Sequence, residues 1–181
     1  MPDPVIIVPY DPRWPERFRR LGTALRAALG EVALRIDHIG STAVPGLDAK
    51  PIIDVQISVA AFEPLDAYRI PLEHLGFVLR ERNPDLTKRY FREKPGIRRT
   101  HMHVRRRGTW SEQCALLFRD YLRTHKEEAQ AYGALKYILA EKYRHDRSAY
   151  TAGKALFIWD LLAEANTWHQ ETGWQPGPSD A

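Results

Sequence analysis

The sequence predicts an α+β fold, in which a mixed β-sheet is flanked by helices and the C-terminal part of the chain is helical. Residues 52–59 (IIDVQISV) alternate strictly between two faces, one apolar and one largely polar, as a strand does. Further strand-like segments occur at 33–39, 76–81, 88–94 and 99–106. From about residue 110 onward the pattern becomes helical. Because strands and helices separate after an initial mixture, an α+β fold is favoured over a doubly wound one.

Apolar side chains at helical spacing predict the individual helices. In residues 13–29, Trp14, Phe18, Leu21, Leu25 and Leu29 fall close to one face, and Gly30 is suited to end the helix. A second helix is expected near 63–75, disturbed by Pro71. The remaining helices are expected from about 110, at 126–144 and at 147–168. We therefore predict one domain over residues 1–169 and a frayed, flexible tail over 170–181.

Composition narrows the class of protein. A chain of 181 residues suits one domain. Cys114 is the single cysteine, which excludes an intramolecular disulfide framework and predicts a cytoplasmic protein. No apolar run approaches the roughly 18 residues that span a bilayer, and the start lacks the basic region of a signal peptide, so no membrane partner is expected. The formal charge of +4 is compatible with a nucleotide, a nucleic acid or another anion.

A Gly-Ser turn followed by a lysine and an aspartate is the most informative motif. Gly40 and Ser41 end a predicted strand, Lys50 follows in a turn-rich stretch, and Asp54 lies on the next strand. Such a turn lets backbone N–H groups and a hydroxyl approach phosphate oxygens. Lysine adds positive charge, and the carboxylate can hold the Mg²⁺ that accompanies phosphates. The alternative is an ordinary strand–turn–strand with an aspartate at its edge.

The segment HIGSTAVPGLDAKPIIDVQISV resembles the signature of the GrpB family. The likeness extends through PYDPRWPERF, THMHV, LLFRDYLRTH, YGALK and YTAGKALFI, and covers about residues 8–168. The family is related to the nucleotidyltransferase superfamily, and some members are fused to dephospho-CoA kinase. The resemblance implies a nucleotidyltransferase-like mixed sheet flanked by helices.

The resemblance also implies a set of Mg²⁺ ligands that this chain fills only in part. Gly40, Ser41 and Asp54 match the superfamily pattern, but its second acidic position falls on Gln56. A third carboxylate would be expected on a strand such as 99–106, which has none. Two-metal transfer needs anionic ligands for both ions. Asp54 with Gln56 would therefore hold Mg²⁺ weakly.

His101 and His103 share one face of the predicted strand 99–106 with Arg99 and Arg105. With Asp54 they could form a two-histidine, one-carboxylate metal centre, or they could act as general acid or base. The neighbouring arginines favour contact with an anionic ligand over metal binding. The alternative is a hydrogen-bonded pair on a polar strand face.

Three cations on the predicted helices belong to segments that match the family: Arg119, Lys136 and Lys154. If these helices pack over the sheet, their side chains would close an anion-binding pocket with Lys50. For each of them, the alternative is a solvated or ion-paired charge on a helix surface.

Three functions remain open. The first is binding of a nucleotide or another phosphorylated small molecule, with Mg²⁺-dependent nucleotidyl transfer in which Asp54 binds the metal and His101 or His103 moves protons. The second is a non-catalytic module that has lost the second metal carboxylate, at Gln56. The third, ranked last, is nucleic-acid binding through the basic segment 80–107. The sequence leaves the ligand's identity, turnover and oligomeric state open.

Overall fold

The structure is a computed structural model that describes residues 4–94 and 99–181. Within those ranges it contains a five-stranded mixed sheet in the order β1-β2-β5-β4-β3. The strands are β1 (Arg35–Ile39), β2 (Ile53–Val59), β3 (Phe77–Leu79), β4 (Lys88–Glu93) and β5 (Thr100–Arg106). β2 and β5 are parallel, whereas the other neighbouring strands are antiparallel. The predicted mixed sheet is confirmed, and each strand lies within the segment that predicted it.

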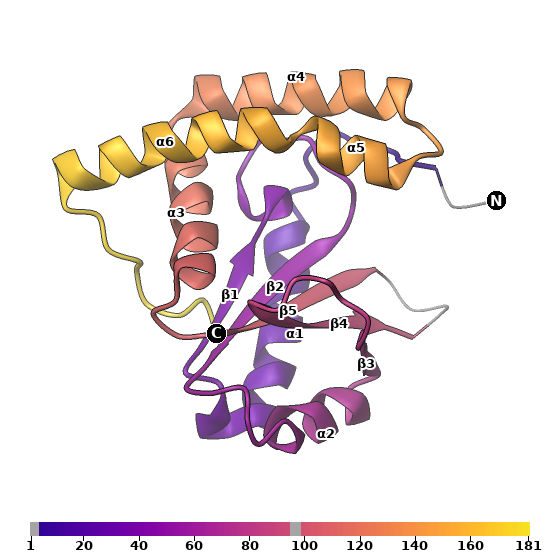
Figure 1. The fold of residues 1–181 in the computed structure, drawn as a ribbon, viewed down its shortest axis with the longest axis vertical. Helices are drawn as coiled ribbons and strands as arrows, with labels where there is room; N and C mark the ends of the chain where they lie inside the picture. Colours follow the sequence, from indigo (N-terminus) through magenta and orange to yellow (C-terminus); the bar gives the residue numbers. More distant parts are fainter. Residues whose placement is uncertain (1–3, 95–98) are drawn as a thin grey trace.

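Helices flank this sheet, as expected for an α+β fold. They are α1 (Trp14–Leu29), α2 (Asp66–His74), α3 (Trp110–Thr124), α4 (Lys126–Lys142), α5 (Arg147–Gly153) and α6 (Ala155–Thr172). Figure 1 shows α4, α5 and α6 gathered at one end of the molecule, with α3 running from them alongside the sheet. The helix expected at 147–168 is two helices that meet at Lys154. Among the described residues, no helix combines the length and apolar character needed to cross a bilayer.

The alternation of β2 decides which helices cover which face of the sheet. Its apolar residues, such as Val55 and Ile57, pack into a core with α1 and α2. Its polar residues face the opposite side, where Ser58 and Gln56 contact Glu112 of α3. Both are fully buried, because α3 covers this half of the polar face. Asp54, at the other end of β2, stays partly exposed.

The C-terminal residues pack against edge strand β1, which differs from the frayed tail that the sequence predicts. The Ile36 N–H donates to Ser179 Oγ (2.8 Å), and the His38 N–H donates to Asp180 Oδ2 (2.9 Å). The Ala181 N–H in turn donates to the Ile36 carbonyl (3.1 Å). An edge strand leaves backbone groups unpaired, and this segment satisfies those of β1. Figure 1 shows the chain end beside β1.

Candidate functional site

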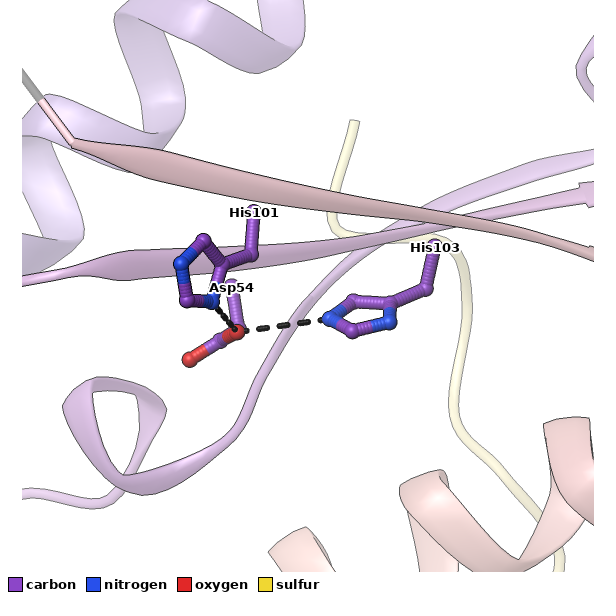
Figure 2. Close-up of side chains that lie close together, drawn as sticks. All are labelled: Asp54, His101 and His103. Carbon is purple, nitrogen blue, oxygen red and sulfur yellow. Dashed lines mark hydrogen bonds and ion pairs between the residues drawn. The ribbon is translucent and has the colours of Figure 1, made fainter. Parts of the chain in front are cut away.

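Asp54 and the two strand histidines converge because β2 and β5 pair in parallel, with Asp54 opposite His101 and Gln56 opposite His103. Asp54 Oδ1 lies 3.2 Å from His101 Nδ1 and 3.3 Å from His103 Nε2. Figure 2 shows both imidazoles pointing at this single oxygen. Tyr90 of β4 packs beside both rings, with centroid distances of 5.7 Å and 5.3 Å. Adjacent strands thus bring one carboxylate and two imidazoles to one point, and all three are side chains of types that can hold a metal ion.

The protonation states of this cluster suit a ligand set. Burial raises the pKa of Asp54, but the hydrogen bonds and charges of His101 and His103 outweigh it and leave the pKa below its usual value. Burial lowers the pKa of His103 to about 4, and the contact with Asp54 offsets this only in part. At neutral pH an ionised carboxylate therefore lies beside a neutral imidazole, the two forms that bind metals.

The Gly-Ser turn lies directly over Asp54. It follows β1, whose last residue Ile39 is paired with Asp54 across the antiparallel ladder. Gly40 has φ 71° and ψ −173°, a conformation essentially restricted to glycine. Ser41 then begins a short 3₁₀ helix. Gly40, Ser41 and Asp54 all line the same pocket. The sequence motif is therefore a tight turn next to an acid, as predicted.

Three lysines reach the same pocket from different parts of the chain. The Lys50 ammonium lies 5.0 Å from the centre of the Tyr150 ring, and the Lys154 ammonium lies 4.7 Å from the same ring centre. The Lys136 ammonium lies 4.7 Å from the centre of the Tyr132 ring. Aromatic faces attract cations, so the two tyrosines hold the lysines without neutralising them.

The lysines also act on one another. Burial and the nearby Lys154 lower the pKa of Lys136 to about 7, although Asp48 opposes the shift. Burial and the nearby Lys50 lower the pKa of Lys154 to about 8. Burial also lowers the pKa of Lys50. Lys136 is only 2% exposed, and its ammonium donates a hydrogen bond to the Asp48 carbonyl. An anion in the pocket would stabilise the charged form of all three lysines.

These groups line a cavity of about 450 Å³ between the sheet, the Gly-Ser turn and helices α3, α4 and α5. The cavity brings together eight of the predicted site residues: Gly40, Ser41, Lys50, Asp54, His101, His103, Lys136 and Lys154. Two other predicted residues, Gln56 and Arg119, do not line it.

Gln56, expected as a weak Mg²⁺ ligand, lies beneath α3 with both ends of its amide occupied. Its Nε2 donates to the Glu112 carbonyl (3.2 Å), and its Oε1 accepts from Arg105 Nη1 (2.6 Å). The amide oxygen is thus held by a guanidinium and is not available to a metal. The same contact draws Arg105, one of the two arginines expected to favour an anion, away from the pocket.

Arg119, expected to contact a phosphate, lies against β1 as a buried ion pair. It pairs with Asp120 (2.7 Å) and Asp180 (2.9 Å), and its Nη1 donates to the His38 carbonyl (3.1 Å). Its side chain is 3% exposed. Arg119 is therefore an ion-paired charge on a helix, as the alternative interpretation has it. Lys136 and Lys154, in contrast, line the pocket.

Tyr132 and Tyr150, which make the cation–aromatic contacts, have no site role among the predictions from sequence. Each precedes its lysine by four residues, Tyr132 before Lys136 and Tyr150 before Lys154. Residues at i and i+4 share a helix face, so this spacing was the signal that could have found them.

The donor set does not fit the Mg²⁺ pair of a nucleotidyltransferase. Among the described residues that line the pocket, Asp54 is the only acid. Mg²⁺ prefers oxygen ligands in octahedral geometry, whereas Asp54, His101 and His103 offer one oxygen and two nitrogens. Their ligand atoms all lie within 4.8 Å of one another. The cluster is therefore compatible with one divalent ion that accepts imidazole nitrogen.

Comparisons with known proteins agree with this architecture. A UPF0157 protein from Pseudomonas aeruginosa is 40% identical over 166 residues, which cover 90% of this chain and 68% of that protein. A crystal structure of GrpB from Enterococcus faecalis has a TM-score of 0.84 at 34% identity and covers 91% of this chain and 99% of that one. A dephospho-CoA kinase from Mycolicibacterium paratuberculosis is 34% identical over 96% of this chain but only 49% of its own length. Residues 4–164 match the family described as GrpB protein, and the chain therefore belongs to the GrpB family.

Proposed function

We propose that this protein binds a phosphorylated small molecule, such as a nucleotide, in the pocket between the Gly-Ser turn and the three lysines. One observation carries the proposal: Lys50, Lys136 and Lys154 line the same cavity. Among the described residues that line it, Asp54 is the only acid, and none of the three lysines forms a salt bridge with a carboxylate there. Clustered cations repel one another, so a ligand that brings several negative charges stabilises their charged forms most strongly.

The residues have separate roles in this proposal. The turn at Gly40 and Ser41 offers backbone N–H groups and a hydroxyl to one phosphate group. The three lysines neutralise further phosphate oxygens as compact charges. Phe118 and Tyr132, whose rings meet edge to face at 5.8 Å, form an apolar wall for a base or another uncharged part of the ligand.

Binding without nucleotidyl transfer is the favoured form of this function. Two-metal transfer requires carboxylates that hold both ions, and Gln56 is bound to Arg105 beneath α3. Transfer that depends on Mg²⁺ remains the second candidate, because His101 and His103 stand next to Asp54 where they could move protons. As part of the same proposal we assign the protein to the cytoplasm, where its single cysteine stays reduced.

Nucleic-acid binding through residues 80–107 is not proposed. Residues 95–98 of this segment lie outside the described residues. Of the rest, Arg105 points into the protein and donates to Gln56. An arginine bound in this way offers little to a phosphate backbone.

The proposal is tested by thermal-shift and calorimetric titration with pyrophosphate, AMP, ATP and CTP, each with and without Mg²⁺. We expect at least one of them to raise the melting temperature and Lys50→Ala to abolish the shift. Lys142→Ala is the matched control, because Lys142 is exposed at the end of α4. If none of the four ligands binds, or if Lys50→Ala binds as wild type does, the proposal fails.

A further inference from the structure

We propose that Asp54, His101 and His103 bind one divalent transition-metal ion, and that this ion and the phosphate ligand bind cooperatively. The metal site stands on its own geometry, whereas the cooperativity rests on the proposed phosphate binding.

The distances within the cluster are those of a coordination shell. Zinc ligands of this type lie about 2.0–2.2 Å from the metal, so neighbouring ligand atoms in a tetrahedral shell are about 3.3–3.6 Å apart. Asp54 Oδ1 is 3.2 Å from His101 Nδ1 and 3.3 Å from His103 Nε2. Both contacts are within hydrogen-bonding reach but longer than the roughly 2.7–2.9 Å that is typical of hydrogen bonds to an ionised carboxylate. Both imidazoles turn a nitrogen to Asp54 Oδ1 (Figure 2), so an ion to one side of these three atoms would contact all of them.

The donor chemistry selects the class of metal. Two imidazole nitrogens and one carboxylate oxygen suit Zn²⁺, Co²⁺, Fe²⁺ or Mn²⁺ better than Mg²⁺. Three protein ligands leave at least one coordination position open. Because the cluster lines the same cavity as Ser41 and Lys50, that position faces the space where the phosphate is proposed to bind.

Charge couples the two ligands. Asp54, Lys50 and Lys154 line the same cavity, where the carboxylate opposes the lowering of both lysine pKa values. A dication on Asp54 would cancel this attraction and add repulsion. A phosphate group would offset this repulsion, because one of its oxygens can bind the metal while the others contact the lysines. By linkage, the metal must strengthen phosphate binding by the same factor.

The test is a titration with Co²⁺, whose visible absorption reports nitrogen and oxygen coordination, with and without AMP. We expect AMP to tighten Co²⁺ binding about 5- to 150-fold, the usual range of such coupling. Asp54→Asn and His103→Gln should each weaken Co²⁺ binding at least about tenfold, while His145→Gln, at an exposed position, should leave it unchanged. Thermal melts confirm that each variant is folded.

The outcomes separate the two proposals. Absence of Co²⁺ binding with and without AMP, or equal binding in wild type and His103→Gln, would show that the cluster is only a hydrogen-bonded group. If AMP still binds in that case, phosphate binding stands and the metal site is refuted. If Co²⁺ binds through Asp54 but none of the phosphates binds, the metal site stands, and the cooperativity fails together with the proposed function.

Discussion

Gly40 lies so close to Asp54 that a Cβ atom added to the glycine would come within 2.8 Å of Asp54 Oδ2. The same atom would lie 3.1 Å from the Asp54 Cβ. The turn and the carboxylate are therefore packed backbone against side chain, with no room for a methyl group. This contact joins the turn that is proposed to bind phosphate to the proposed metal ligand.

Gly40→Ala should disturb both the turn and Asp54. The positive φ alone costs a non-glycine residue about 1–3 kcal/mol, and for a chain of this size each kcal/mol lowers the melting temperature by about 2–4 °C. The clash should also displace Asp54 and abolish Co²⁺ binding. Gly46→Ala is the control, since Gly46 also has a positive φ of 78° but no neighbouring atom within 4 Å of the added Cβ. Loss of Co²⁺ binding in both variants would contradict this assignment.

Lys136→Met should stabilise the ligand-free protein at pH 6. Burial and Lys154 lower the pKa of Lys136 to about 7 in the folded state, against a reference value of 10.5. Below pH 7 the buried Lys136 side chain is charged in the folded protein. Between pH 7 and pH 10.5 the unfolded state holds one more proton than the folded state, so the wild-type free energy of unfolding rises with pH over this range. The variant should therefore exceed wild type by about 1–3 kcal/mol at pH 6, and by less at pH 9.

Urea unfolding at both pH values measures this difference. The exposed Lys142→Met on the same helix is the control and should show no such pH dependence relative to wild type. A gap that stays constant or grows between pH 6 and pH 9 would contradict the prediction. Pyrophosphate binding should weaken in Lys136→Met, so that the stabilised variant is the less functional one.

Local pattern predicted the strands and which neighbouring side chains share a strand face. The alternation in residues 52–59 put Asp54 and Gln56 on one face of a strand, and the i, i+2 spacing did the same for His101 and His103. These relations depend only on the two-residue period of a strand, so they hold in the structure. The Gly-Ser turn was equally local. The sequence did not predict the pairing of β2 with β5, which brings the two faces together, because it joins segments that lie far apart in the chain.

Long-range packing decided what the pattern could not. Nothing near Gln56 in the sequence shows that Glu112 and Arg105 will occupy its amide, because both partners lie about fifty residues away. Arg119 likewise finds Asp180 across 61 residues. The packing of the C-terminal segment was not predicted for the same reason. Its glycine and proline content predicts fraying, but its hydrogen-bond partners lie on β1, more than 140 residues away.

Glu112 should be essential for the packing of α3 on the sheet. It is fully buried, and its carboxylate accepts hydrogen bonds from Ser58 Oγ (2.5 Å) and the Gly108 N–H (2.8 Å). Glu112→Leu would leave both donors unpaired, at about 1–3 kcal/mol each. Urea unfolding should show this loss, and a double-mutant cycle with Ser58→Ala should show less than additive destabilisation. The exposed Glu171→Leu should change stability little, and additivity in the cycle would contradict the proposed bond.

Asp180→Ala should loosen the C-terminal segment without affecting ligand binding. The Asp180 carboxylate accepts from the His38 N–H and from Arg119, so its loss removes a charged partner from a buried guanidinium. We expect a loss of about 1–3 kcal/mol in the free energy of unfolding and faster hydrogen exchange at the His38 amide. Asp180→Asn keeps an acceptor oxygen and should lose less. Because Arg119 does not line the pocket, pyrophosphate affinity should match wild type. A drop in affinity as large as that of Lys50→Ala would contradict the separation of the C-terminal segment from the pocket.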